Sequence, residues 1–92
     1  MNGRIETYIH SDSITQNKGG AMVKVTCDTD FAAKVAKFKD FCVSAARFAY
    51  AANSTVWDEV IALFPDVEDV RKVLEKEFRE KIVVSDIVIL KL

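Results

Sequence analysis

Apolar and polar side chains alternate near the N-terminus, which is typical of a β-strand with one buried face. Between Gly3 and His10, one face carries Ile5, Thr7 and Ile9, and the other carries Arg4, Glu6, Tyr8 and His10. A second alternating segment has Ala21, Val23, Val25 and Cys27 on one side. The polar stretch between them, residues 11–20, ends in Lys-Gly-Gly and predicts a mobile loop. The sequence therefore predicts an antiparallel hairpin over residues 3–27.

From Thr29 the apolar spacing changes to three and four residues, which predicts helices over residues 29–80. Thr29 is a suitable N-cap, and Asp30 places a negative charge where the helix dipole favours it. The sequence Asn-Ser-Thr at residues 53–55 interrupts the first long helix. The expected buried stripe of that helix consists of Val35, Phe38, Cys42, Ala45, Phe48 and Ala49.

Two shorter helices are expected after this interruption. Thr55 and Asp58 predict a capping box at the start of the first one, and Pro65 ends it. Its buried stripe is Trp57, Val60, Ile61 and Phe64. Asp66 is expected to cap the last helix, whose exposed side would carry the ion pairs Glu68–Lys72 and Glu75–Arg79. The buried stripe of that last helix is Val67, Val70, Leu74 and Phe78.

The C-terminal segment, residues 82–92, is rich in β-branched side chains and predicts a strand that is apolar on both faces. Such a strand requires cover on both sides. The predicted order of elements is ββαααβ in a single domain of 92 residues. We therefore predict an α+β fold, in which about three helices pack on one face of a small antiparallel three-stranded sheet.

Composition narrows the class of partner. The chain has 13 basic and 14 acidic residues and a net charge of −1, so no excess of positive charge favours nucleic acid or an anionic membrane surface. Its apolar runs are too short for a membrane-spanning helix. Cys27 and Cys42 are expected to be free thiols in a reducing cytosol. A globular cytoplasmic protein fits this composition.

The sequence contains no recognisable constellation of catalytic residues. His10 is the single histidine, and it has no nucleophile nearby in the pattern and too few companions for a metal site. Asp28, Asp30 and Asp40 do not have the spacing of a calcium-binding loop, so we interpret them as capping and solvated charges. We therefore expect no catalytic residue, no cofactor and no metal, and we interpret the chain as a binding module rather than an enzyme.

Two segments carry a resemblance to a known family. They are the strand Gly-Arg-Ile-Glu-Thr-Tyr-Ile-His at residues 3–10 and the run Gly-Ala-Met-Val-Lys-Val-Thr-Cys-Asp-Thr-Asp-Phe-Ala-Ala-Lys at residues 20–34. Together they resemble the N-terminal half of the core, or dimerisation, region of translation elongation factor Ts. The likeness is strong from Gly3 to about Phe41. From Ala51 to Leu92 only the order of elements agrees.

The resemblance implies a function in translation elongation. In that family, an Asp-Phe pair at this junction contacts the nucleotide-binding domain of elongation factor Tu, and the aromatic ring disturbs the Mg²⁺ and phosphate region so that GDP leaves. Carried over to this sequence, Phe31 is the wedge, Asp30 is its polar companion and Thr29 is the helix cap, with Lys34 as a fourth partner-binding residue. The implied function is binding to elongation factor Tu with guanine-nucleotide exchange. The alternative is a non-exchanging structural or adaptor module that recruits elongation factor Tu or mediates oligomerisation.

The periodicity leaves the position of Phe31 open. One unbroken helix from residue 29 places Phe31 close in angle to Val35 and Phe38, on the buried stripe. A first turn that ends near residues 33–34 leaves Phe31 apart, on the surface. Spacing favours the core position, whereas the resemblance favours an exposed tip. Val35 stands where the family usually has a polar residue, and this favours a helix that continues without a break.

Several features of the family do not occur in this sequence. They are an N-terminal three-helix module with a Thr-Gly-Ala motif, the second half of the core and a C-terminal segment. We therefore expect a stand-alone half-core. Because the last strand is apolar on both faces and the second half of the core is missing, we also expect a homodimer or another partner to cover the sheet.

Overall fold

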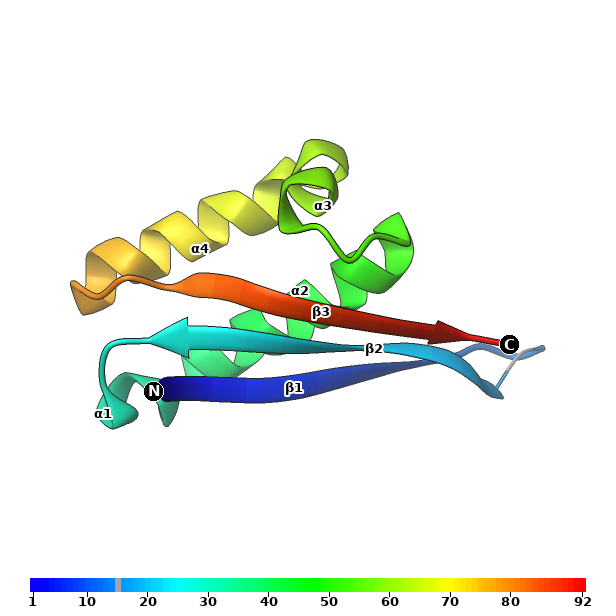
Figure 1. Ribbon diagram of the computed structural model, residues 1–92, viewed down its shortest axis with the longest axis horizontal. Coiled ribbons are helices and arrows are strands. Elements are labelled where there is room, and N and C mark those ends of the chain that lie inside the picture. The colour runs from blue at the N-terminus through cyan, green and yellow to red at the C-terminus, as the bar shows by residue number, and fades with distance from the viewer. Residues whose placement is uncertain (15) are drawn as a thin grey trace.

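A long helix lies across one face of a three-stranded antiparallel sheet in the computed structural model, which describes residues 1–14 and 16–92 (Figure 1). The strands are β1 (Asn2–Ser11), β2 (Gln16–Cys27) and β3 (Val83–Lys91), in the spatial order β1-β2-β3. The helices are α1 (Asp30–Ala33), α2 (Ala36–Ala52), α3 (Trp57–Leu63) and α4 (Pro65–Phe78). Helix α2 packs on the sheet, and α3 and α4 pack on α2 and on each other. The predicted α+β fold is confirmed.

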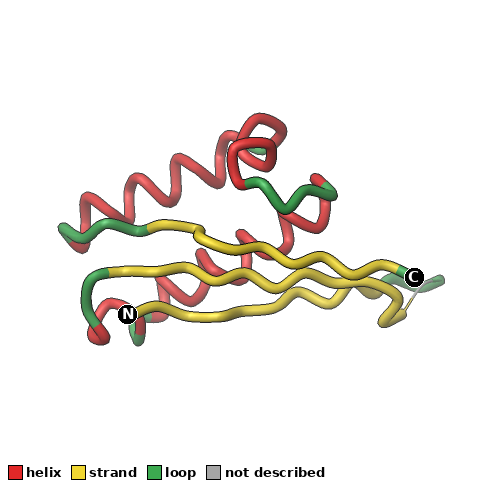
Figure 2. The backbone as a smooth tube through the Cα atoms, in the orientation of Figure 1, coloured by secondary structure: helices red, strands yellow, loops and turns green. Residues whose placement is uncertain are grey.

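The hairpin pairs β1 with β2 over nearly the whole length of both strands, from Asn2 opposite Cys27 to Ser11 opposite Gln16. This confirms the predicted hairpin. The predicted loop over residues 11–20 is wrong for residues 16–20, which belong to β2. Position 15 of that expected loop lies outside the described residues. Figure 2 shows the two strands running together to the end of the molecule opposite α1.

The two glycines that suggested a loop have a different role. A side chain on Gly20 would place its Cβ 2.6 Å from the carbonyl oxygen of Tyr8, and one on Gly19 would place its Cβ 2.5 Å from the hydroxyl of Tyr50. Glycine inside a strand often marks such a close approach. The two glycines therefore let β2 lie close to Tyr8 and Tyr50, and the strand continues through them.

The hydrophobic core lies between α2 and the sheet. Its α2 side chains are Phe38, Phe41, Cys42, Ala45, Ala46 and Ala49. They contact buried residues of β2 and β3, which include Val23, Val25, Val84 and Ile87. The predicted stripe of α2 is confirmed in its centre, but spacing alone missed Phe41 and Ala46. Among the described residues, no helix has the length and apolar character needed to cross a membrane.

Strand β1 turns its more polar side toward the helices. Arg4, Glu6, Tyr8 and His10 are partly buried, whereas Ile5, Thr7 and Ile9 are exposed. The polar side chains are paired: Arg4 forms a 2.6 Å ion pair with Glu6, and the Tyr8 hydroxyl is hydrogen-bonded to His10 Nδ1 at 2.9 Å. Hydrogen bonding makes their partial burial tolerable. As a result, the apolar side of β1 lies on the open face of the sheet.

Strand β3 is covered on one side only. Val84 and Ile87 are buried in the core, while Val88 and Leu90 are exposed on the open face. The pairing register aligns Thr7, Met22 and Val88 in one row across that face, and Ile9, Gly20 and Leu90 in the next. The cover that the sequence predicted for the second face is therefore not supplied by the described residues of this chain.

Two predictions about how the shorter helices begin are wrong. The Ser54 hydroxyl, rather than a Thr55–Asp58 capping box, accepts a hydrogen bond from the Val56 amide at 3.1 Å and is bonded to Glu59. Pro65 ends α3 as expected, but it is also the first residue of α4, a position that favours proline. Asp66 consequently lies inside the first turn and does not cap it.

The expected ion pairs of α4 are replaced by one arginine. Arg71 binds the carboxylates of both Glu68 and Glu75, the latter at 2.9 Å, and donates to the Ile82 carbonyl at 2.8 Å. The Arg71 side chain is largely buried because its guanidinium donates this hydrogen bond to the backbone just before β3. Val70, predicted on the buried stripe, is 49% exposed, since α4 contacts only α2 and α3 closely.

Helix α4 ends in a left-handed residue that is not glycine. Arg79 has φ 56° and ψ 38°, and the Glu80 amide donates to the Glu75 carbonyl at 3.3 Å. This is the hydrogen bond of a Schellman motif, in which glycine usually occupies the left-handed position. Helix α2 ends in the same way at Asn53, a residue type that tolerates this conformation better.

We expect Arg79→Gly to raise the free energy of unfolding by about 0.5–1 kcal/mol, since relief of the left-handed strain exceeds the added entropy of the unfolded chain. Urea denaturation monitored by circular dichroism measures the change. Lys76→Gly, in the last turn of the same helix, is the control and should instead lower stability by about 1 kcal/mol. A loss of stability in both variants would contradict the assignment of strain to Arg79.

Both thiols should be unreactive in the folded protein. Burial raises the pKa of Cys42 to about 12, and burial followed by the Glu80 charge raises the pKa of Cys27. Thiolate is the reactive form, so a disulfide-exchange reagent at pH 8 should modify neither cysteine until denaturant is added. Rapid native-state labelling of Cys42, compared with free cysteine in the same buffer, would refute this expectation.

Candidate partner-binding site

The segment between β2 and α2 forms a short projecting tip, defined here as residues 28–34. Strand β2 ends at Cys27, and the extended backbone of Thr29 (φ −128°, ψ 151°) leads into α1. The Thr29 hydroxyl accepts a hydrogen bond from the Ala32 amide at 3.2 Å, which is the predicted N-cap. Asp30 lies in the first turn, as expected from the helix dipole.

The helix breaks immediately after this turn. The amides of Lys34 and Val35 donate to the carbonyls of Phe31 and Ala32 at 3.2 and 3.1 Å, which closes a tight turn. Val35 is extended (φ −73°, ψ 135°), and α2 begins at Ala36. The expectation that Val35 carries one helix through without a break is therefore wrong.

The break decides the position of Phe31. Its side chain is 81% exposed, while the neighbouring Ala32 and Ala33 are 2% and 5% exposed. Because α1 is not in register with α2, its small residues face the core and its aromatic residue faces outward. The core position favoured by spacing alone is wrong, and Phe31 lies on an exposed tip.

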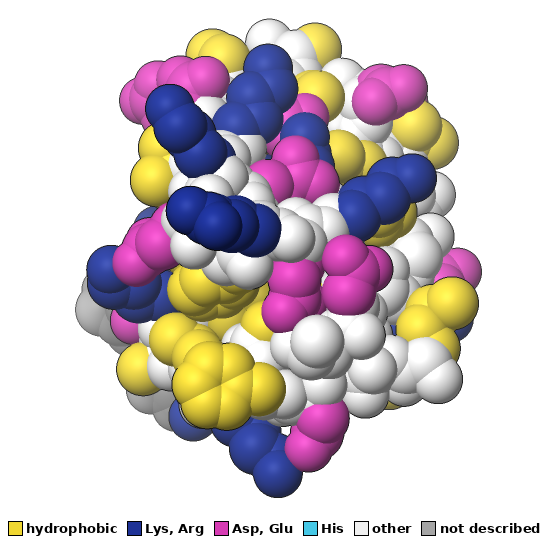
Figure 3. All heavy atoms as spheres, turned by 90° about the vertical axis from the view of Figure 1, so that its left-hand side faces the viewer, with side chains coloured by type: hydrophobic (Ala, Val, Ile, Leu, Met, Phe, Trp, Pro, Cys, Tyr) yellow, Lys and Arg dark blue, Asp and Glu magenta, His cyan; other side chains and the backbone are white. Residues whose placement is uncertain are grey.

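Two charged residues lie on the same turn as the exposed ring. Asp30 forms a 2.9 Å ion pair with Lys34, four residues later, and this contact raises the pKa of the Lys34 ammonium. Figure 3 looks at the end of the molecule that carries α1, where hydrophobic side chains stand beside both acidic and basic ones. Thr29, Asp30, Phe31 and Lys34 are thus gathered in one tip, with the phenylalanine as its only large apolar side chain.

Residues far away in the sequence anchor this tip, and the sequence pattern did not single them out. Arg4 donates to the Ala33 carbonyl at 3.2 Å, and the Asn2 side-chain amide donates to the Asp28 carbonyl at 3.0 Å. Glu80 accepts hydrogen bonds from the amides of both Asp28 and Thr29. Each is an ordinary polar residue in β1 or just after α4, so only the tertiary contact distinguishes it.

The three aspartates considered for a cation do not form a site. Asp28 accepts a hydrogen bond from the Lys81 amide at 3.0 Å, and Asp30 is paired with Lys34. Within residues 1–14 and 16–92, no group of three or more His, Cys, Asp or Glu residues is arranged to hold a metal ion. Asp28 and Asp30, interpreted from the sequence as capping and solvated charges, are exposed and are engaged in these two contacts.

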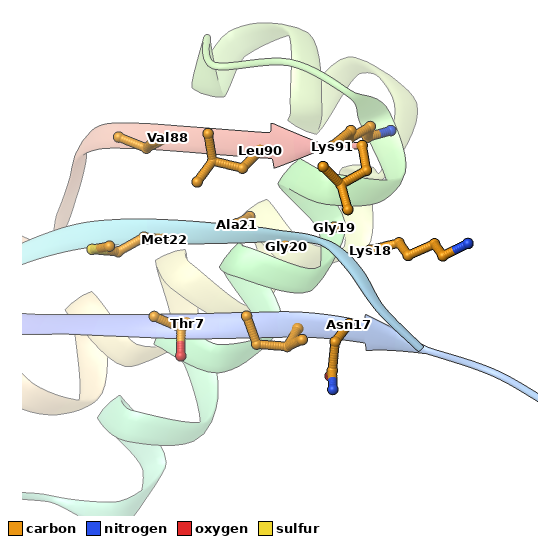
Figure 4. Close-up of a pocket in the computed structure, with 12 residues that line it drawn as sticks. Thr7, Asn17, Lys18, Gly19, Gly20, Ala21, Met22, Val88, Leu90 and Lys91 are labelled. Carbon is orange, nitrogen blue, oxygen red and sulfur yellow. The ribbon is translucent and has the colours of Figure 1, made fainter. Parts of the chain in front are cut away.

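A second candidate surface is the open face of the sheet. A groove of about 690 Å³ follows all three strands near their hairpin end. Figure 4 shows Met22, Val88 and Leu90 lining it from adjacent strands, with Thr7 at one edge. The tip and this open face lie on different parts of the fold, so they can be occupied at the same time.

Comparison with known proteins relates the chain to one translation factor. Elongation factor Ts of Herpetosiphon aurantiacus is 35% identical over 75 residues, which cover 82% of this chain and 36% of that protein. Elongation factor Ts of Rubrobacter xylanophilus is 42% identical over 40 residues, which cover 44% of this chain and 18% of that protein. No protein-family model matches the sequence. The chain is thus similar to elongation factor Ts, and its matches span at most about a third of the length of these relatives.

Proposed function

We propose that this protein binds elongation factor Tu through the tip, using Phe31 as an anchor with Thr29, Asp30 and Lys34 around it. The observation that supports this most directly is the 81% exposure of Phe31 on a turn whose neighbouring alanines are buried. An exposed aromatic side chain on a firmly held element loses little conformational freedom when it enters a pocket, which favours binding. The similarity to elongation factor Ts supports the choice of partner.

Binding of this kind would promote release of GDP if the bound conformation of elongation factor Tu holds nucleotide less tightly. Thermodynamic linkage requires that each ligand weakens the other by the same factor. The protein would then act as a guanine-nucleotide exchange factor in the cytoplasm. It would need no catalytic residue of its own, because the exchange follows from differential binding.

A second candidate function is a non-exchanging adaptor, and the open face of the sheet favours it. Ile5, Ile9, Met22, Val88 and Leu90 are all exposed there. An apolar face of three adjacent strands is typical of an interaction surface. An adaptor would use the tip to hold elongation factor Tu and the sheet to mediate oligomerisation, without accelerating nucleotide release.

For the open face we propose a second copy of this chain as the occupant. Its charged pair, Lys24 and Asp86, is internally neutralised at 2.8 Å, so the face suits an uncharged, apolar partner. A second copy offers the same apolar rows, which allows a two-fold symmetric interface in which each sheet covers the other. Burial of both faces would also supply the missing cover of β3.

Phe31→Ala should raise the dissociation constant for elongation factor Tu by about 30-fold or more, since loss of a central aromatic anchor typically costs at least about 2 kcal/mol. Leu63→Ala is the matched control, because Leu63 is also an exposed apolar side chain (64%) but belongs to α3. Isothermal titration calorimetry measures both. Absence of wild-type binding at tens of micromolar, or equal effects of the two variants, would contradict the proposal.

Release of fluorescent GDP from preloaded elongation factor Tu separates the two candidate functions. An exchange factor accelerates release in proportion to its concentration, and Phe31→Ala abolishes the acceleration. An adaptor binds without changing the release rate. Binding without acceleration would therefore exclude the exchange function and retain the adaptor.

The homodimer is tested by light scattering after size-exclusion chromatography. Leu90→Lys, at a side chain that is 74% exposed on the open face, should convert a dimer to a monomer because it buries an unpaired charge in the interface. Val73→Lys places the same charge on an exposed position of α4 and should leave the dimer intact. A clean wild-type monomer at micromolar concentration would refute the homodimer.

A further inference from the structure

We propose that Glu80 is a positioning residue for the tip: its carboxylate fixes the turn that presents Phe31. This inference rests on the proposed function, because the tip is the surface assigned to elongation factor Tu. Glu80 follows α4 and is separated from Thr29 by 51 positions in the sequence. It contacts the Asp28 and Thr29 amides and the Thr29 hydroxyl, and it acts on Phe31 through the turn that these two residues begin.

Glu80 makes three hydrogen bonds to the start of the tip. Its Oε1 atom accepts from the amides of Asp28 and Thr29 at 2.9 and 3.0 Å, and its Oε2 atom accepts from the Thr29 hydroxyl at 2.5 Å. Hydrogen bonds to a carboxylate are shorter and stronger than those between neutral groups. These contacts fix the backbone on the N-terminal side of α1.

The hydrogen bond between Glu80 and the Thr29 hydroxyl also orients that hydroxyl as the cap of α1. An ionised carboxylate can only accept, so the Thr29 hydroxyl must donate its proton to Glu80. Its lone pairs are then free for the Ala32 amide, which donates to the same oxygen at 3.2 Å. Glu80 therefore orients the hydroxyl that caps the turn containing Phe31.

A reciprocal contact joins the same two segments. Asp28 Oδ2 accepts from the Lys81 amide at 3.0 Å, so each segment supplies a carboxylate to the backbone of the other. Arg79 holds the left-handed conformation that turns the chain toward the tip immediately before Glu80. A strained residue next to a set of directed contacts is often part of a functional arrangement.

The tip needs this support because it cannot be stable alone. Helix α1 has four residues, far fewer than an isolated helix needs in water. Without Glu80, its N-terminal side would keep three contacts: the Asn2 amide to the Asp28 carbonyl, the Lys81 amide to the Asp28 carboxylate, and the Cys27 thiol, which donates to the Thr29 carbonyl at 3.2 Å. Binding would then have to order the tip, and this ordering would weaken affinity.

The test combines amide hydrogen exchange by nuclear magnetic resonance with calorimetric titration of elongation factor Tu. In Glu80→Ala, exchange at the amides of Asp28 and Thr29 should accelerate about tenfold, and the dissociation constant should rise about tenfold. Glu77→Ala is the matched control: it removes the same charge three residues earlier, where the carboxylate binds Lys37 at 2.8 Å instead. It should change neither quantity.

Two further variants separate positioning from a general loss of stability. Glu80→Gln keeps one acceptor oxygen for the two amides. Compared with Glu80→Ala, it should restore most of the protection of these amides from hydrogen exchange. Combining Glu80→Ala with Phe31→Ala should weaken binding by less than the sum of the two single effects, because Glu80 acts through the turn that presents Phe31. Additive effects in this double variant, or unchanged exchange in Glu80→Ala, would overturn the proposal.

The hydrogen-exchange measurement does not require elongation factor Tu. If the wild type does not bind elongation factor Tu but Glu80→Ala still accelerates hydrogen exchange at Asp28 and Thr29, then the proposed function fails, while the stabilisation of the tip by Glu80 stands. If binding is present and both Glu80→Ala and Glu77→Ala leave it unchanged, then the positioning role of Glu80 fails while the proposed function stands.

Discussion

The packing of α2 against one face of the sheet is the interaction on which the rest of the structure depends. Ala45, Ala46 and Ala49 are fully buried along that helix, and their small side chains let its backbone approach the strands closely. Phe38 and Phe41 fill the remaining space toward its N-terminal end. Burial of this stripe is the dominant favourable term for a domain of this size. Helix α2 covers one face of the sheet, and none of the described helices covers the other face. That second face therefore stays apolar and exposed.

The position of α2 creates the tip. The chain must pass from the end of β2 at Cys27 to the start of α2 at Ala36, and it does so through one separate helical turn. That turn buries Ala32 and Ala33 and directs Phe31 outward. Its ends are held by side chains from β1 and from the segment after α4, so three parts of the sequence meet there. The exposed aromatic residue is therefore presented by a supported turn rather than by a free loop.

Much of the fold was predictable because the period of the apolar positions distinguishes strands from helices. The alternating segments gave the hairpin, the three-and-four spacing gave α2, and the β-branched run gave β3. The errors have common causes. The sequence predicts a loop at Gly19 and Gly20 because it does not reveal the close approach of Tyr8 and Tyr50. The expected partners of Glu68 and Glu75 were wrong because Arg71 is recruited by the Ile82 carbonyl, a contact between elements.

For the candidate site, the order of residues along the chain was enough to predict a cap at Thr29, an acid at Asp30, an aromatic residue at Phe31 and a base at Lys34. These follow from local chemistry, since capping and pairing four residues apart depend only on neighbours along the chain. Three features could not be predicted in this way: the helix breaks at Val35, Phe31 points outward, and Glu80 reaches the start of the turn. Those outcomes depend on how α2 and α4 pack, because contacts between distant segments, and not spacing within one segment, fix the direction of a short turn.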